Sequence, residues 1–293
     1  MNLLSDKDIH CLCELFKTKK ENINPIKQLF GGMSNKVYLV EIDNKLYTYR
    51  IPGFNSHLFV DRKEELKAIK IGNELGITSD TIYFSYDTGV KVSKYIDGIV
   101  LTEINCFDYL VEIADTLKML HNMEVKNIKK YGLLERLDKY ESYNDKIEPL
   151  YFINKDFWIQ EYNEKFKETK LVFCHGDAQR SNFVKGENRL YLFDYEYSSL
   201  NDPYYDIASF GNVSFDDSVQ LLKIYLGYNP RNEELAKLMF YRIYQTLQWY
   251  QVAKYKHVIG LGKDLKLDFE QIAARYLHIA STLINQYKKI TGE

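Results

Sequence analysis

Two short apolar runs in the second half of the chain most restrict what it can fold into. Leu171–Cys174 and Leu190–Phe193 have the length and composition of β-strands. An aspartate comes shortly after each run, Asp177 after the first and Asp194 directly after the second. The intervening sequence Lys-Gly-Glu-Asn at 185–188 has the residue types of a turn. We therefore predict one hairpin in which an acidic side chain follows each strand.

Asn182 adds a third polar side chain to this hairpin, five positions after Asp177. In kinases an aspartate after one strand orients the acceptor hydroxyl, an asparagine shortly after it holds Mg²⁺, and an aspartate at the next strand's end bridges Mg²⁺ to the phosphates. His-Gly-Asp alone is most often an ordinary turn, and a lone aspartate after an apolar run is most often a cap. The joint spacing is rarer, because loop lengths and residue types must agree together. It predicts phosphoryl transfer, with Asp177 as the catalytic residue and Asn182 and Asp194 as ligands of Mg²⁺.

The same region resembles a known family. The sequences HGDAQRSNF and YLFDYEYSSLNDPYYDIA are similar to the catalytic region of the choline/ethanolamine kinases, and most similar to the bacterial choline kinases of the LicA type. The second sequence is the more specific, because aminoglycoside phosphotransferases of the same wider group usually match only a shorter part of it. The resemblance implies an α+β, bilobal protein-kinase-like fold. Its five-stranded antiparallel N-lobe is expected in residues 1–95 and its mainly helical C-lobe in residues 96–293.

The expected N-lobe begins with a strand, a glycine turn and a second strand within Ile26–Val40, followed by a third strand at Lys45–Ile51. Taken alone, the glycine pair is best explained as a hairpin turn. The resemblance implies instead that Gly31, Gly32 and Asn35 belong to the loop over the ATP phosphates, where backbone N–H groups can approach them.

Three further positions are expected to contact the nucleotide. The resemblance implies that Arg50, near the end of the third strand, binds phosphate. Asp61 is a suitable N-cap for the next helix, and Glu65 within that helix would ordinarily be a solvated charge. The family's N/D-R-x-x-E pattern implies that Glu65 pairs with Arg50 and orients it. Two more strands are predicted at Ile82–Tyr86 and Gly89–Tyr95. The position of Tyr95 and Ile96, where the second of these strands ends, implies a hinge whose backbone groups bind the adenine edge.

Apolar spacing becomes helical after residue 107, and the longest predicted helices are Asn232–Val258 and Leu265–Lys289. A quaternary ammonium acceptor needs aromatic faces and nearby negative charge. LicA-type kinases carry Q-x-x-x-W-x-x-W here, and this sequence matches it at Gln245 and Trp249. Val252 stands where the second tryptophan is expected, so the sequence departs from the family there.

The resemblance extends to four residues around the catalytic motif. It implies that Tyr197 contacts the acceptor and that Asp206 supplies charge to the acceptor pocket or braces the catalytic loop. His175 is expected to brace the loop by hydrogen bonding without transferring protons. Gln179 is expected to contact Mg²⁺ or the acceptor.

Composition narrows the possible partners. The net charge is −2, with 39 basic and 41 acidic residues well mixed, which gives no indication of nucleic acid or a membrane surface. The four cysteines have no zinc spacing and are expected to be free thiols. We find neither a signal peptide at the N-terminus nor an apolar run of membrane-spanning length. The expected location is the cytoplasm.

Together these observations predict an ATP- and Mg²⁺-dependent kinase that phosphorylates the hydroxyl of choline. Ethanolamine, thiamine and an aminoglycoside remain alternative acceptors. A non-catalytic binding module of the same fold is the alternative from another class, and the loss of Asp177, Asn182 or Asp194 would have signalled it. All three are present.

Overall fold

The structure is a computed structural model, and it describes residues 3–29 and 35–293. Gly31 and Gly32 of the expected phosphate loop lie outside the described residues. The chain divides into two compact units, each described separately below. The first unit comprises Met1–Cys106 and Arg180–Tyr197, and the second comprises Phe107–Gln179 and Ser198–Glu293. This division differs from the predicted boundary after residue 95. The first unit extends to Cys106, and it also includes Arg180–Tyr197 from the catalytic region.

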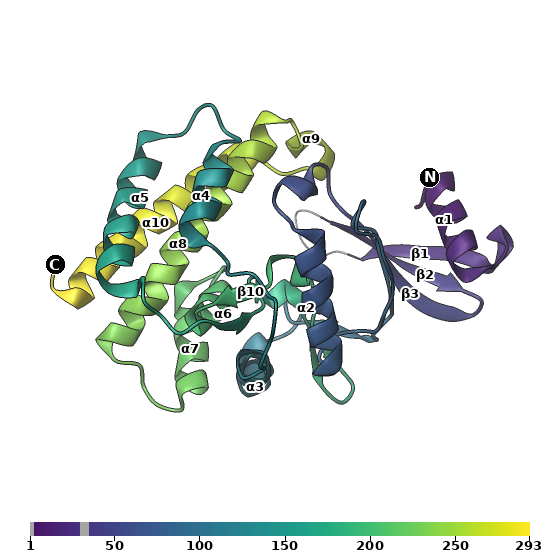
Figure 1. The fold of residues 1–293 in the computed structure, drawn as a ribbon, viewed down its shortest axis with the longest axis horizontal. Helices are drawn as coiled ribbons and strands as arrows, with labels where there is room; N and C mark the ends of the chain where they lie inside the picture. The colour runs from purple at the N-terminus through teal and green to yellow at the C-terminus, as the bar shows by residue number, and fades with distance from the viewer. Residues whose placement is uncertain (1–2, 30–34) are drawn as a thin grey trace. The chain divides into compact units, whose positions relative to one another are not determined.

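An antiparallel five-stranded sheet forms the first unit, as predicted, and Figure 1 shows it beside helix α1 (Asp6–Phe16). Every neighbouring pair in it is antiparallel. The strand order is β1 (Ile23–Leu29), β2 (Lys36–Ile42), β3 (Lys45–Ile51), β5 (Lys91–Lys94) and β4 (Thr81–Phe84).

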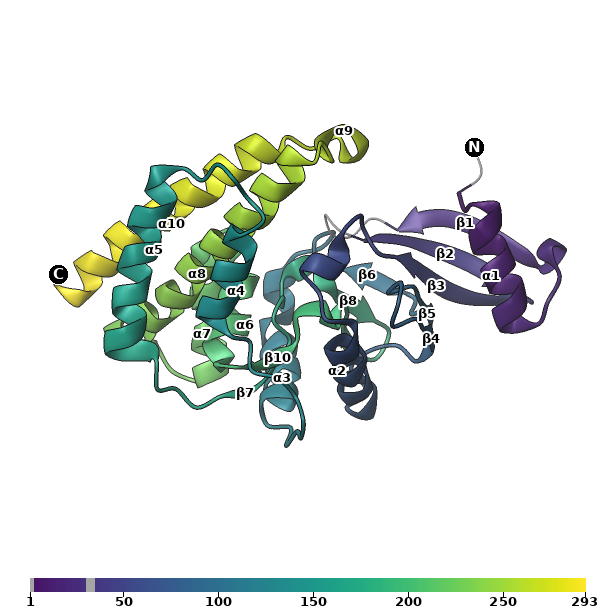
Figure 2. The ribbon, with the colours of Figure 1, turned by 45° about the horizontal axis from the view of Figure 1, so that its top comes forward.

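The two faces of this sheet differ because successive side chains in a strand point to opposite sides. One face packs against Leu12 of α1, and Figure 2 shows this helix lying along β1–β3. That face is apolar and carries Tyr38, Val40, Ile42, Tyr49 and Val92. Residues of the other parity line a cavity: Val37, Thr48, Arg50, Lys91 and Ser93. The alternation therefore places the polar side chains of β3 and β5 on the cavity side.

Helix α2 (Arg62–Glu74) begins at Asp61, whose side chain accepts hydrogen bonds from the amides of Lys63 and Glu64, as the sequence predicts. A three-stranded sheet completes the unit, in the order β6 (Gly98–Val100), β8 (Phe183–Gly186) and β9 (Leu190–Leu192).

The predicted hairpin is wrong in its pairing. β9 pairs with β8, which begins directly after Asn182, and not with the strand before Asp177. That strand, β7 (Val172–Cys174), belongs to the second unit and pairs with β10 (Ser199–Asn201). The turn at 187–189 closes the shorter hairpin, because tight hairpins join strands through loops of about two to five residues.

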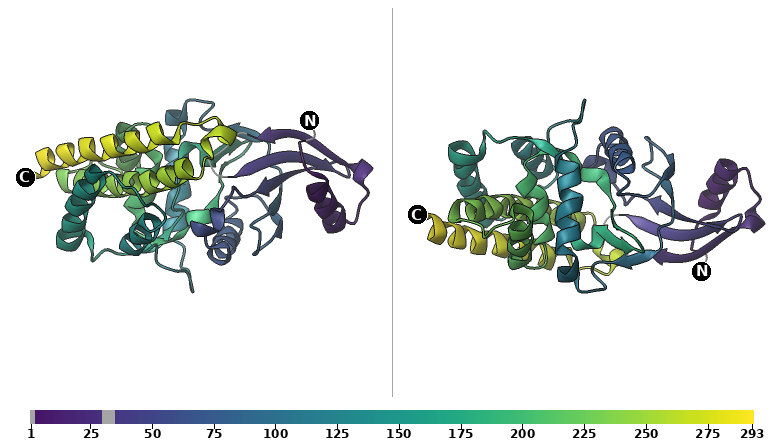
Figure 3. Two further views of the ribbon diagram at one scale, coloured as in Figure 1. Left: turned by 90° about the horizontal axis from the view of Figure 1, so that it is seen from above. Right: turned by 90° about the horizontal axis from the view of Figure 1, so that it is seen from below.

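The second unit is otherwise helical. Its longest helix, α8, lies side by side with α10, as Figure 3 shows, and also packs against α4, α5, α6 and α7. Their bounds are α3 (Leu110–His121), α4 (Leu133–Glu141), α5 (Pro149–Glu161), α6 (Pro203–Phe210), α7 (Phe215–Leu226), α8 (Asn232–Val258), α9 (Gly262–Leu265) and α10 (Phe269–Thr291).

Buried tyrosines fill much of the helical core. Tyr131, Tyr205 and Tyr244 are almost inaccessible to solvent, and their rings pack together. Their hydroxyls are satisfied: Tyr205 donates to Tyr131 (2.7 Å), and Tyr131 donates to Gln248 (2.7 Å). Aromatic burial with a paired polar tip explains why so many tyrosines can pack in one core. Within the part of the chain that the structure describes, no helix is long and apolar enough to cross a membrane.

Candidate active site

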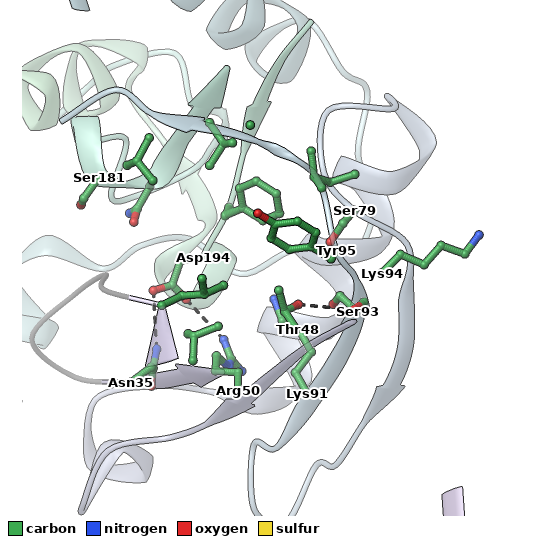
Figure 4. A pocket seen from close by; sticks show the side chains of 18 of the residues that line it. Asn35, Thr48, Arg50, Ser79, Lys91, Ser93, Lys94, Tyr95, Ser181 and Asp194 are labelled. Carbon is green, nitrogen blue, oxygen red and sulfur yellow. Dashed lines mark hydrogen bonds and ion pairs between the residues drawn. The ribbon is translucent and has the colours of Figure 1, made fainter. Parts of the chain in front are cut away.

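The first unit contains a cavity of about 400 Å³, drawn in Figure 4. Its walls come from β1, β2, β3 and β5, from the segment 94–100 and from the β8–β9 hairpin with the residues around it. Of the residues predicted to contact the nucleotide or Mg²⁺, it brings together Asn35, Arg50, Tyr95, Ile96, Asn182 and Asp194. Tyr95 already donates its backbone amide to the carbonyl of Leu46 (3.1 Å), so that amide is engaged within the protein.

Arg50 is the best-defined cation of this cavity. The distance from its Nη1 to Oε1 of Glu65 is 2.5 Å, and the distance to Oδ1 of Asp194 is 3.3 Å. Its Nη2 donates to the carbonyl oxygen of Gly89 (3.0 Å). Burial opposes its charge, but Glu65 and then Asp194 outweigh burial, and the pKa of Arg50 is raised. The expected pairing of Arg50 with Glu65 is therefore present in the structure.

Arg62 and Glu196 extend the pair into a buried charge cluster. Arg62 lies 2.6 Å from Oε2 of Glu65 and 3.5 Å from Oε2 of Glu196. Burial, reinforced by the negative charge of Asp194, raises the pKa of Glu196 to about 8. The sequence alone indicated no role for Arg62 or Glu196, although both fall within the motifs that resemble the family.

Lys91 adds a second cation to the cavity, directly opposite Arg50 in the β3–β5 register. Burial, together with the charge of Arg50, lowers the pKa of Lys91 to about 8. Its ammonium group forms no hydrogen bond or ion pair with any residue that the structure describes. Sequence reasoning missed Lys91, because only the strand register brings it beside Arg50.

Asn182 and Asp194 present the hard oxygen donors that Mg²⁺ prefers. The hairpin holds them together, because Phe193, which precedes Asp194, donates its amide to the carbonyl of Asn182 (2.8 Å). Asp194 has a positive φ of 69°, which is uncommon for a residue other than glycine and is concentrated at functional sites. Among the residues that the structure describes, its Oδ2 accepts one long hydrogen bond, from Nδ2 of Asn35 (3.5 Å). This donor set fits a Mg²⁺ ion.

The segment that carries Asp177 lies in the second unit and is held by Asp206. The two carboxylate oxygens of Asp206 accept the backbone amides of His175 (2.7 Å) and Gly176 (2.8 Å). His121 lies 3.1 Å from Asp206 and 2.9 Å from the hydroxyl of Tyr225. Gly176 has a φ of 83°, a left-handed conformation that suits glycine and turns the chain towards Asp177.

His175 is fully buried, and its Nδ1 accepts the amide of Asp177 (3.3 Å). Its carbonyl accepts the hydroxyl of Ser198 (2.8 Å). These contacts accord with the expected bracing role. Asp177 itself is half-buried, and its Oδ2 accepts a hydrogen bond from Nε2 of Gln179 (3.0 Å).

Two residues expected near the acceptor are buried and engaged within the protein. Asp206 is fully inaccessible and accepts the amides of His175 and Gly176, which accords with the second of its two expected roles, bracing the loop. Gln245 is 1% exposed; its amide donates to Tyr205 and Ser209, and its oxygen accepts from Arg242. Neither side chain has an atom available for a substrate.

The other acceptor residues stay predictions. Trp249 is half-buried on α8, and Tyr197 is 5% exposed in the first unit. Val252, at the position of the family's second tryptophan, is 2% exposed and therefore packs in the core. An indole at 252 would have to displace core side chains.

Gln179 also differs from its expected metal role. Its Oε1, the atom that a metal ion would need, accepts a hydrogen bond from Nδ2 of Asn212 (2.6 Å). Its Nε2 is directed to Asp177. Asn212 lies 33 positions further along the chain, so no local signal connected the two residues.

Comparisons with known proteins add evidence from sequence and fold. The family model described as choline/ethanolamine kinase matches residues 26–235. Protein LicA of Haemophilus influenzae is 26% identical over 272 residues, covering 84% of this chain and 78% of that protein. Mouse ethanolamine kinase 1 is 27% identical over 310 residues, covering 91% and 84%.

Solved structures share the fold. The choline kinase LicA from Streptococcus pneumoniae superposes with a TM-score of 0.78 at 24% identity, over 96% of this chain and 99% of that one. The aminoglycoside phosphotransferase APH(4)-Ia superposes with a TM-score of 0.70 at 10% identity, over 94% and 97%. The match of the family model over most of the sequence, together with the kinase-like fold, shows that this chain is a member of the choline/ethanolamine kinase family.

Proposed function

We propose that this protein transfers the γ-phosphoryl group of ATP to the hydroxyl of choline. The observation that carries the proposal is the buried Arg50, held 2.5 Å from Glu65 and 3.3 Å from Asp194 in the wall of the cavity. A guanidinium fixed in this way is ready to bind phosphate oxygens, and the glutamate keeps it oriented. The relatives named as choline or ethanolamine kinases support a small amino alcohol as the acceptor.

Each residue has one task in this reaction. Asp177 orients the hydroxyl and accepts its proton as the oxygen attacks the γ-phosphorus. The bond from that phosphorus to the bridging oxygen breaks, and ADP leaves with the electron pair. Asn182 and Asp194 would hold Mg²⁺, which neutralises phosphate charge when bound. Arg50 and Lys91 bind the triphosphate, and Tyr95 and Ile96 border the adenine.

Choline is favoured over ethanolamine by the likeness to LicA, which is named a choline kinase in Streptococcus pneumoniae, and by Trp249, whose ring can face a quaternary ammonium. Ethanolamine is the second candidate, because ethanolamine kinase 1 of mouse and of human is 27% identical to this chain, against 26% for LicA. A primary ammonium would require hydrogen-bond acceptors, whereas a quaternary one requires aromatic faces.

The test is ATP consumption by the purified protein with choline, ethanolamine, thiamine and kanamycin, each with and without Mg²⁺. We expect Mg²⁺-dependent turnover, with the highest kcat/KM for choline. The Asp177→Asn variant should lower kcat by several orders of magnitude while ATP affinity is retained, because the change removes hydroxyl orientation and leaves phosphate binding intact. Turnover of Asp177→Asn near the wild-type rate, or no turnover of any amino alcohol by the wild type, would refute the proposal.

A further inference from the structure

Gln179 and Asn212 form a short hydrogen-bonded relay that ends on the catalytic carboxylate. Nδ2 of Asn212 donates to Oε1 of Gln179 (2.6 Å), and Nε2 of Gln179 donates to Oδ2 of Asp177 (3.0 Å). All three residues belong to the second unit. The two amides connect the loop after α6 to the catalytic segment after β7.

The carboxylate of Asp177 determines which groups donate and which accept in this relay. An ionised carboxylate only accepts hydrogen bonds, so Gln179 must present its NH₂ group to Asp177. The oxygen of Gln179 then faces Asn212, which must donate a hydrogen bond to it from its NH₂ group. The charge of Asp177 therefore sets the orientation of both amides.

Asn212 is held by its surroundings. Its backbone amide donates to the carbonyl of Ser209 (3.2 Å), and its carbonyl faces Nη2 of Arg242 at 3.5 Å. The preceding Gly211 lies so close to Ser218 that a Cβ there would come within 2.7 Å of its hydroxyl oxygen. Oδ1 of Asn212 is buried and has no hydrogen-bond partner among the residues that the structure describes. A buried, unpaired oxygen lowers stability. The orientation of the Asn212 amide that donates from Nδ2 to Gln179 is therefore kept at a cost in stability.

We propose that Gln179 and Asn212 are positioning residues, which fix the carboxylate of Asp177 in the direction needed to receive the acceptor hydroxyl. This inference rests on the proposed function, in which Asp177 orients that hydroxyl. It replaces the metal role expected for Gln179, because the oxygen of Gln179 is occupied by Asn212.

Asn212→Asp tests the relay with almost no change in shape. When ionised, the carboxylate introduced at position 212 cannot donate a hydrogen bond. Gln179 must then turn its NH₂ group towards that carboxylate and its oxygen towards Asp177. We expect kcat to fall about 10- to 100-fold at pH 8, because small displacements of a catalytic group cost rates of this order. KM for ATP and the Mg²⁺ requirement should stay within about twofold of wild type.

The pH profile separates positioning from packing. The introduced carboxyl regains a donor when it is protonated, so the kcat of Asn212→Asp relative to wild type should recover as the pH is lowered from 8 towards the ordinary pKa of an aspartate, about 4. The control Asn212→Leu has no titrating group, and its kcat relative to wild type should be low at every pH. An Asn212→Asp variant with wild-type kcat at pH 8, or one whose defect does not recover at lower pH, overturns the inference.

Gln179→Glu gives opposite results for the two roles of Gln179. As a metal ligand, the added carboxylate would tighten Mg²⁺ binding and preserve turnover. As part of the relay, it places a second negative group against Asp177, so kcat should fall at least tenfold with unchanged Mg²⁺ dependence. Tighter Mg²⁺ binding with preserved turnover would restore the metal role and refute the relay.

Melting temperatures test the relay without catalysis. Gln179→Glu should lose stability as the pH rises from 5 to 8, and adding Asp177→Asn should abolish that loss, because only the pair of carboxylates repels. If this coupling is present in a protein that phosphorylates no amino alcohol, the contact stands and the proposed function fails. If the protein is active but the coupling is absent, the proposed function stands and the relay fails.

Discussion

At the scale of single residues, the buried carboxylate of Glu65 is expected to contribute strongly to the stability of the first unit. It pairs with Arg50 and Arg62, so Glu65→Gln leaves both guanidinium groups without their shared partner. We expect a loss of about 3–5 kcal/mol in the free energy of unfolding at pH 7. Urea unfolding would measure this loss. The control is Glu74→Gln at the exposed end of the same helix, which should lose less than about 1 kcal/mol.

The difference between wild type and Glu65→Gln should depend on pH. Burial raises the pKa of Glu65, but the charge of Arg50 outweighs burial, and the pKa is lowered from 4.5. A carboxyl whose pKa is lower in the folded state stabilises the protein above its ordinary pKa. That stabilisation is lost as the pH falls through the folded-state pKa. The gap between the two proteins should therefore shrink below pH 4.5, and a constant gap would contradict the ion pair.

We expect Lys91 to lower the stability of the folded protein and to strengthen the binding of ATP. Its pKa is lowered from 10.5 to about 8, so the cost of burying its charge is full below pH 8 and disappears as the pH rises to 10.5. Lys91→Met should stabilise the protein by about 1–3 kcal/mol at pH 7, with the gain vanishing at the upper end of that pH range. KM for ATP should rise about tenfold or more, because a charge-assisted phosphate contact is lost.

Lys94→Met is the matched control for Lys91→Met. Lys94 belongs to the same strand, but its exposed side chain pairs with Asp80, and Figure 4 shows it pointing away from the cavity. Little change in stability or KM is expected. A KM for ATP that Lys91→Met leaves unchanged would exclude Lys91 from phosphate binding.

At the scale of elements, α6 and the loop after β7 depend on each other through Asp206. Asp206→Asn replaces one acceptor oxygen with a donor that faces N–H groups or His121. We expect a loss of about 2–4 kcal/mol in stability and a fall in kcat. An acceptor-binding role would instead raise KM for choline alone in a protein of normal stability. Asp216→Asn, on the exposed surface of α7, is the control for both measurements.

The sequence predicted elements with strong local patterns and missed pairings between distant segments. Lys45–Ile51 and Asn232–Val258 are observed with the predicted bounds, because alternation, turn residues and helical periodicity are all local. β8 and β10 have three or four residues each, and nothing in so short a run identifies its partner strand.

The same limit applies to the site. The aspartates and the asparagine of the motif could be predicted, because their spacing along the chain identifies them. Lys91 and Asn212 could not, because each meets its neighbour only through the fold: Lys91 through strand register and Asn212 across 33 positions.

At the scale of the whole molecule, the two units should respond to different ligands. The cavity of the first unit predicts that Mg·ATP slows amide hydrogen exchange in β3, β5 and the β8–β9 hairpin. Choline should slow exchange near Trp249 in the second unit. Asp194→Ala should abolish the protection by Mg·ATP, since it removes a metal ligand. Protection by Mg·ATP confined to the second unit would contradict the nucleotide assignment.

The discontinuous first unit also has a consequence for biosynthesis. When Met1–Cys106 has emerged from the ribosome, all strands of the five-stranded sheet are available, but the β8–β9 hairpin and Asp194 have not yet been synthesised. Strand β6 then lacks its partner, and Arg50 lacks one of its two carboxylates. This lobe can be completed only after Tyr197 emerges, when much of the helical unit has also been translated. A truncated N-terminal fragment is therefore a poor substitute for the lobe, and a pause in translation before residue 180 would expose an unfinished nucleotide site.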